Sequence, residues 1–462
     1  MVRFFVFAIL GSFLSGFLGG ISPTLGATAT GELPKKAPSI AKRKDVKESI
    51  PPKNPNPPKK PKKNEKENAG KVSPPEDTSG TKKMKTIVVD ARRLKDHKLS
   101  ETIRYIKEHP EVRFKLQNTT IDPAFVLPLL TALSEAQVLD KIKDITFVML
   151  PTANGQTLDE AVFIGKILRY LEHLEGLELL CLGATDKVVK AISTKIPQLK
   201  SLSLFGPGIT DETVINLAKE LPNLTKIHLI NAHLTTKGVQ TLADTKNFSK
   251  LQTLGISGPN LKDSDFVALG TGNPNLHSLS IVGHTFKNMA TVMNLLKTMP
   301  KLHTLDVSET NVTDDVAKAI VENSKNLKNL NISETAITKD GIKEIIKNLD
   351  LTTFKINNLK GLGNTELELI ATSQPALRKF HFSGISFSDA GLIDVILGLK
   401  KLNDITLIPI SGSKWILSEA VARVLVSKKH KIQYLHIQAD RLPEDLRMKI
   451  ENGIPNIRIE YQ

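Results

Sequence analysis

The side chains of this 462-residue chain that could most readily bind a metal are eleven histidines and one cysteine. His228, His381 and His436 occupy equivalent places in a repeated strand-and-helix unit, and imidazole nitrogens bind Zn²⁺ at about 2.0–2.1 Å. The repeats put His228 and His381 six strands apart, about 29 Å, and His381 and His436 two strands apart, about 10 Å. We therefore expect surface histidines and no metal site.

Sequence motifs for catalysis are absent. The chain has no Gly-x-Gly-x-x-Gly, phosphate-binding loop, His-Glu-x-x-His or Cys-x-x-Cys. Cys181, the single cysteine, sits in Leu-Leu-Cys-Leu beside an expected strand, which favours a buried structural thiol over a nucleophile. We expect a protein that is not an enzyme, with no cofactor, no small-molecule substrate and no specific nucleic-acid partner.

The elements that position these residues come from an internal repeat. Residues 302–316 and 327–342 have nearly the same sequence at an offset of 25 residues, and a period in this range indicates a solenoid. Leu327, Leu330 and Ile332 predict a strand with one buried face. Thr338 is expected to cap a helix whose apolar side chains recur at helical spacing. One such unit is too small to bury its own apolar face, so copies must stack.

The repeat extends through residues 86–462. Anchor leucines recur every 24 to 27 residues from Leu174 to Leu402, and looser units precede and follow them. The pattern predicts about 15 strands in one α/β solenoid of parallel strands and helices. Two longer repeats carry insertions at 151–157 and 409–415, and such insertions form loops on one face of a solenoid.

The repeats resemble the leucine-rich repeat family. The Leu-x-x-Leu-x-Leu anchors carry the resemblance, together with helix starts such as Ile209-Thr210-Asp211 and helix exits such as Leu221-Pro222-Asn223-Leu224. The nearest classes are the long ribonuclease-inhibitor-like and cysteine-containing repeats, although their regular Asn or Cys ladder is missing here. The resemblance implies a horseshoe with a concave parallel sheet and convex helices.

The first 29 residues are typical of an export signal. Arg3 precedes an apolar run over residues 4–21, and Ala27-Thr28-Ala29 fits a cleavage site. The alternative is a retained signal anchor, because the run approaches the length of a membrane span. We expect a secreted or cell-envelope protein.

Residues 30–85 form a Lys- and Pro-rich tail with almost no large apolar side chains. Such a segment cannot bury enough surface to offset its chain entropy, so we expect it to be disordered. It holds a net charge of +9 out of +15 for the whole chain. Two interpretations stay open: a solvated spacer, or a polycationic segment that contacts an anionic polymer or a membrane surface.

The expected concave face is polar and small-sided in its central repeats. Tight protein interfaces are enriched in Trp, Tyr and Arg, and larger side chains gather only in the C-terminal repeats. Trp415, the single tryptophan, either joins an interface or packs into the core beneath its loop. The candidate partner-binding residues are Lys379, His381, Trp415, Tyr434 and His436.

These features favour an exported, non-catalytic recognition or adhesion module. Its partner is expected to be a protein or a cell-envelope polymer bound on the concave face. The alternative is an intracellular substrate adaptor of the ubiquitin-ligase type, a role that many proteins of the resembled family have. The apolar N-terminal run argues against that alternative.

Overall fold

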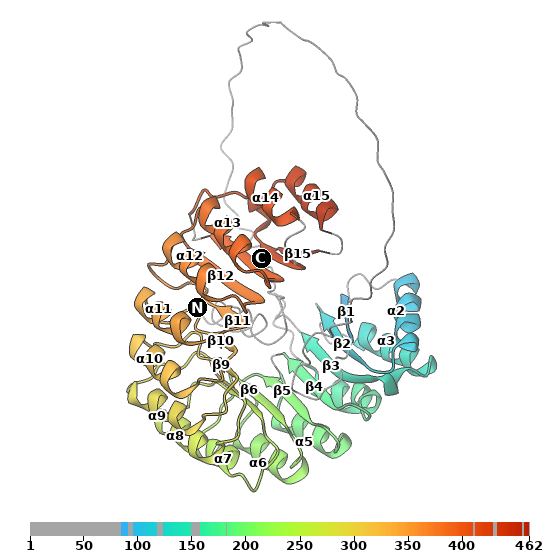
Figure 1. The fold of residues 1–462 in the computed structure, drawn as a ribbon. Helices are drawn as coiled ribbons and strands as arrows, with labels where there is room; N and C mark the ends of the chain where they lie inside the picture. The colour runs from blue at the N-terminus through green and yellow to red at the C-terminus, as the bar shows by residue number, and fades with distance from the viewer. Residues whose placement is uncertain are drawn as a thin grey trace, which may run out of the picture. The chain divides into compact units, whose positions relative to one another are not determined.

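The computed structural model describes residues 85–90, 96–117, 123–148, 158–181, 183–409, 412–427, 432–454 and 457–461. Within them, a single parallel sheet runs in chain order through fifteen strands, which confirms the predicted α/β solenoid (Figure 1). The predicted signal segment and all of the tail except Lys85 lie outside the described residues. The strands are β1 (Lys85–Asp90), β2 (Val112–Gln117), β3 (Ile142–Val148), β4 (Gly176–Leu180), β5 (Ser201–Phe205), β6 (Lys226–Ile230), β7 (Thr253–Ile256), β8 (Ser278–Ile281), β9 (Thr304–Asp306), β10 (Asn329–Asn331), β11 (Thr353–Lys355), β12 (Lys379–Ile385), β13 (Asp404–Pro409), β14 (Tyr434–Ile437) and β15 (Arg458–Tyr461).

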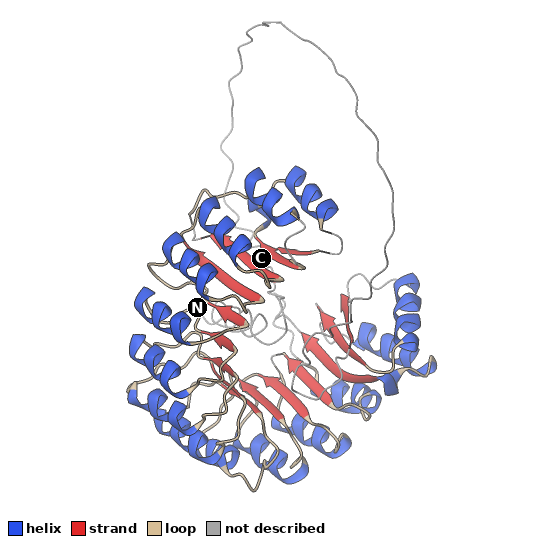
Figure 2. Ribbon diagram, viewed as in Figure 1, coloured by secondary structure: helices blue, strands red, loops and turns tan. Residues whose placement is uncertain are grey.

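Helices connect successive strands and lie on the outer side of the curved sheet (Figure 2). They are α2 (Asp96–Glu108), α3 (Pro123–Glu135), α5 (Asp186–Lys195), α6 (Asp211–Glu220), α7 (Thr236–Ala243), α8 (Asp263–Gly272), α9 (Ala290–Thr298), α10 (Asp314–Asn323), α11 (Lys339–Asn348), α12 (Asn364–Ser373), α13 (Asp389–Gly398), α14 (Glu419–Val426) and α15 (Glu444–Gly453). Between β3 and β4 the helix is replaced by three short pieces, α4 (Glu160–Val162), η3 (Phe163–Ile167) and η4 (Leu168–Tyr170). Short turns η2 (Leu139–Lys141) and η5 (Ala439–Arg441) complete the set.

The core is a continuous layer between the sheet and the helices. The anchor leucines from Leu174 to Leu402 are all buried in it. Leu330 is buried in register between Leu305 and Phe354 of the neighbouring strands, as predicted. Stacking therefore supplies the apolar cover that a single 25-residue unit lacks.

An Asp–Thr ladder joins the helix starts of successive repeats. Thr338 caps α11 as predicted, because its Oγ1 accepts a hydrogen bond from the Asp340 N–H at 3.2 Å. The Thr338 N–H and O–H in turn donate to the two carboxylate oxygens of Asp314 in the preceding repeat, at 2.8 and 2.6 Å. The same two-pronged contact links Thr210 to Asp186 and Thr235 to Asp211.

For Asp314 and Asp211, a glycine in the first turn of the following helix makes room for the carboxylate. A Cβ added to Gly341 would lie 2.3 Å from Asp314 Oδ1, and one added to Gly238 would lie 2.2 Å from Asp211 Oδ1. Real Cβ atoms do not approach oxygen this closely. The Thr-x-x-Gly helix starts therefore combine a cap with a gap for the neighbouring repeat's aspartate.

No helix in the described part of the chain is long and apolar enough to cross a membrane. The predicted signal or anchor segment at residues 1–29 is outside that part.

Candidate functional site

Two rows of side chains line the inner face of the sheet. The first row consists of the residues two positions after each anchor residue. Most of its side chains are partly exposed, including those of Lys379 and Tyr434. The second row consists of the residues four positions after each anchor residue, and it is buried throughout the regular repeats. His228, His381 and His436 belong to this row, so the expectation that they are exposed is wrong. Some of its members hydrogen-bond across neighbouring strands, as where Asn331 Nδ2 donates to Asp306 Oδ2 at 2.9 Å. The buried row comprises Ser203, His228, Gly255, Ser280, Asp306, Asn331, Lys355, His381, Thr406 and His436.

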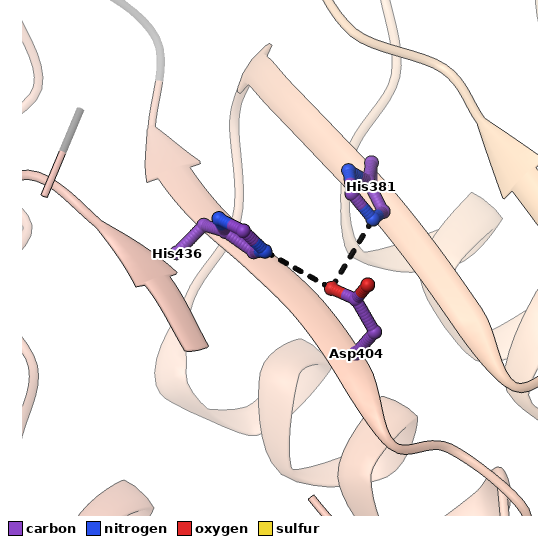
Figure 3. A group of neighbouring side chains, drawn as sticks. All are labelled: His381, Asp404 and His436. Carbon is purple, nitrogen blue, oxygen red and sulfur yellow. Dashed lines mark hydrogen bonds and ion pairs between the residues drawn. The ribbon is translucent and has the colours of Figure 1, made fainter. Parts of the chain in front are cut away.

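Near the C-terminal end of this face, the side chains of His381, Asp404 and His436 converge (Figure 3). Strand β13 contributes Asp404, which is 1% exposed, between strands β12 and β14. His381 of β12 and His436 of β14 reach toward it from either side. His436 Nε2 donates a hydrogen bond to Asp404 Oδ1 at 3.1 Å, and His381 Nε2 lies 3.2 Å from the same oxygen.

The expectation that His381 and His436 are too far apart to share a ligand is wrong. Ligand atoms of these two residues and Asp404 all lie within 4.8 Å of one another. β13 lies between β12 and β14 as expected, but both imidazoles extend toward Asp404 of β13, and the ring centroids are 5.4 Å apart. Asp404 was absent from the predicted site residues, although the repeat register places it between Lys379 and Tyr434.

Burial and hydrogen bonding fix the charges in this group. Burial is the main reason that the pKa of His381 falls to about 4, so its imidazole is neutral near pH 7. Burial acts to raise the pKa of Asp404, but the two imidazoles facing Oδ1 outweigh it, and the pKa lies well below its ordinary value. An ionised carboxylate can only accept hydrogen bonds, so the proton of His436 must reside on Nε2.

Two lysines adjoin the group. Lys379 Nζ lies 3.6 Å from Asp404 Oδ2, with 40% of its side chain exposed. Lys355, one strand earlier, is buried, and this burial is the main reason that its pKa falls to about 8, although the charge of Asp306 opposes the shift. The site therefore places one carboxylate, two lysines and two histidines within the four neighbouring strands β11–β14.

Trp415 lies apart from the other four predicted residues. Its ring packs against Phe387 with centroids 4.9 Å apart, and its Nε1–H donates to Asp389 Oδ1 at 2.8 Å. Asp389 begins α13, so the indole occupies the place that a threonine fills in the Asp–Thr ladder. The half-buried ring contacts the hydrophobic core, and the structure supports the packing interpretation of Trp415.

A second polar group lies on the N-terminal half of the inner face. Glu178 accepts hydrogen bonds from Thr146 at 3.0 Å and from Lys226 at 2.8 Å. Ser203 Oγ lies 3.3 Å from His228 Nδ1 and 3.4 Å from Glu178 Oε1. In a serine triad the acid orients the histidine, whereas here it faces the serine. This group has a hydrogen-bonding geometry different from that of a nucleophile and its base.

Cys181 is buried as predicted, and burial raises the pKa of its thiol to about 12. A thiol with this pKa is protonated at neutral pH and is a poor nucleophile.

These observations define the chain as an α/β repeat solenoid of leucine-rich-repeat type with a polar inner face. No protein-family model matches it, and no curated protein does. Among solved structures, the chain is similar to one from the yeast complex of Rad7 and Elc1. The two share 16% identity at a TM-score of 0.49, and the match covers 79% of this chain and 93% of that one. A protein from Bacteroides fragilis is similar at 20% identity and a TM-score of 0.35, covering 55% and 76%.

Proposed function

We propose that this chain is a non-catalytic recognition module that binds a protein partner on the inner face of its sheet, chiefly over strands β12–β14. Stacked repeats produce extended curved surfaces of the kind that solenoids use for binding. In the described part of the chain, each of the fifteen strands contributes side chains to this inner face.

The observation that carries the proposal is the uneven distribution of side chains on that face. Strands β7 to β10 present Ser, Thr, Gly, Asn and Asp, whereas β12–β14 present the charged and aromatic side chains of Lys379 and Tyr434 around the histidine–aspartate group. Lys379 is substantially exposed and Tyr434 partly so. Tyrosine is one of the residue types enriched among the hot spots of protein interfaces.

The test is partner affinity measured with matched variants of the full chain. A partner isolated on the wild-type protein is titrated against Lys379→Ala, Tyr434→Ala and the control Lys318→Ala, whose side chain is 64% exposed on the outer helix α10. We expect each inner-face variant to weaken binding by about tenfold, the effect of losing roughly 1.4 kcal/mol. An effect confined to Lys318→Ala would place the interface on the helices and refute the proposal.

We also propose that the basic tail, residues 30–85, contacts an anionic polymer or membrane surface independently of the solenoid. The tail concentrates +9 of charge in a short segment, and such binding weakens with salt. Removal of residues 30–85 should abolish the salt-sensitive binding and leave the protein partner bound. Equal binding of the anionic polymer without the tail would assign that contact to the solenoid.

Export is proposed from Arg3, the apolar run and the Ala27-Thr28-Ala29 pattern. N-terminal sequencing of the mature protein should find a start near residue 28 or 30. Recovery of intact Met1 from a membrane fraction would instead show an anchored protein.

A further inference from the structure

We propose that His381, Asp404 and His436 bind a divalent transition-metal ion, with Zn²⁺ as the best match. The proposal is independent of the partner proposed above, because it requires only these three side chains. They come from three adjacent strands, β12, β13 and β14, and converge on one point of the inner face (Figure 3).

The ligand atoms are already spaced for a metal. Bonds of about 2.0–2.1 Å in a tetrahedral site put ligand atoms roughly 3.3 Å apart. The two imidazole Nε2 atoms lie 3.1 and 3.2 Å from Asp404 Oδ1, and all three groups have ligand atoms within 4.8 Å of one another. Only the separation between the two nitrogens has to adjust, which small rotations of the imidazoles can provide.

The donor set suits zinc. Neutral imidazole and carboxylate are ligands of Zn²⁺ and related transition metals, whereas Ca²⁺ and Mg²⁺ prefer oxygen alone. The ion would replace the protons now facing Asp404. Each imidazole then presents the Nε2 lone pair to the ion and keeps its remaining proton on Nδ1.

Thr406 provides a second, independent observation at the proposed metal site. It lies in register between His381 and His436, and its side chain is buried. Its Oγ1 makes no hydrogen bond within the described residues. Three protein ligands leave a fourth tetrahedral position, and a water held there would give the Thr406 hydroxyl a partner.

The neighbouring lysine limits the affinity. Lys379 Nζ, 3.6 Å from Asp404 Oδ2, competes with a cation for the single carboxylate of the site. Replacing this ammonium with a neutral side chain should strengthen metal binding, since repulsion between like charges is removed. A purely hydrogen-bonded histidine–aspartate group would show no such effect, because it binds no ion.

The experiment is calorimetric titration of the full chain, carrying no histidine tag, with Zn²⁺. We expect one ion per chain with an affinity on the order of micromolar or tighter. His381→Ala and Asp404→Asn should each weaken binding by at least about tenfold, and Lys379→Gln should tighten it. His228→Ala is the matched control, because His228 has the same place in its repeat but belongs to no such group among the described residues, and it should bind as the wild type does.

Co²⁺ provides a second readout, since its visible absorption reports coordination by nitrogen and oxygen. The spectrum should appear with the wild type and His228→Ala and vanish with Asp404→Asn. Circular dichroism establishes that each variant is folded, and His381→Gln replaces His381→Ala where the latter is not. Failure of the folded wild type to bind Zn²⁺, or binding unchanged by the loss of His381 and Asp404, would overturn the proposal and leave a hydrogen-bonded group only.

Discussion

Replacing Gly341 with alanine should destabilise the protein, although helix propensity predicts the opposite. Glycine within a helix costs about 0.5–1 kcal/mol relative to alanine, and Gly341 lies in the first turn of α11. In the structure, however, the new Cβ would lie 2.3 Å from Asp314 Oδ1 and 2.8 Å from Ile337 Cγ2. The carboxylate must move away, and its two hydrogen bonds from Thr338 are lost or weakened.

The size of the effect follows from those two contacts. Hydrogen bonds to a charged acceptor contribute about 1.5–3 kcal/mol when buried, and we reduce this to roughly 1 kcal/mol each for this solvent-exposed pair. Loss of both, less the gain in helix propensity, leaves a net destabilisation of about 1–1.5 kcal/mol. Urea denaturation of the full chain, followed by circular dichroism, measures this difference.

Two controls isolate the cause. Gly165, in η3, has no atom within 4 Å of its would-be Cβ, so Gly165→Ala should stabilise the protein by up to about 1 kcal/mol. In an Asp314→Ala background, Gly341→Ala should no longer be destabilising, giving a coupling energy of roughly 2 kcal/mol, the contribution of the two hydrogen bonds. A stabilising Gly341→Ala in the wild type would refute the role assigned to the Asp–Thr ladder.

Three further predictions concern the core, the thiol and the inner face. Leu330→Ala should cost about 2–5 kcal/mol, because its buried site cannot collapse between two strands; a loss below about 1 kcal/mol in a denaturant titration would contradict the register. Cys181 should react with a thiol reagent only in denaturant, since its pKa is about 12, and rapid labelling of the native protein would contradict its burial. Burial acts to raise the pKa of Glu178, but Lys226 and hydrogen bonds outweigh it and hold the pKa below 4.5. The unfolded chain therefore takes up the proton first as pH falls below about 5, and wild-type stability should drop there; the drop should be smaller in Glu178→Gln, and equal acid sensitivity would exclude this contribution.

Much of the fold could be predicted from periodicity alone. The anchor spacing placed every strand from β4 to β13, and the Leu-x-x-Leu-x-Ile pattern identified Leu330 as core. Thr338 was predicted as a cap because the first backbone N–H groups of any helix need an acceptor. These features follow from the spacing of residue types within one repeat, which can be seen directly in the sequence.

The side-chain contacts between repeats were harder to predict from the sequence. In the sequence, Asp314 is indistinguishable from any acidic residue at a helix start. Its hydrogen bond with Thr338 joins residues that are 24 positions apart. The same limitation affected the histidines. Strand spacing describes backbones, whereas His381 and His436 meet through side chains that extend over the intervening strand. A sequence estimate that included side-chain length, and the register of Asp404, would have grouped them.

Site-specific photo-crosslinking tests the central claim, that the inner face over β12–β14 contacts a partner. A photoreactive amino acid is placed at Lys379 on the inner face and, in a second protein, at Lys318 on the outer helices, both of which have exposed side chains. We expect a covalent adduct with the partner from position 379 and none from position 318. An adduct from position 318 alone would contradict that claim.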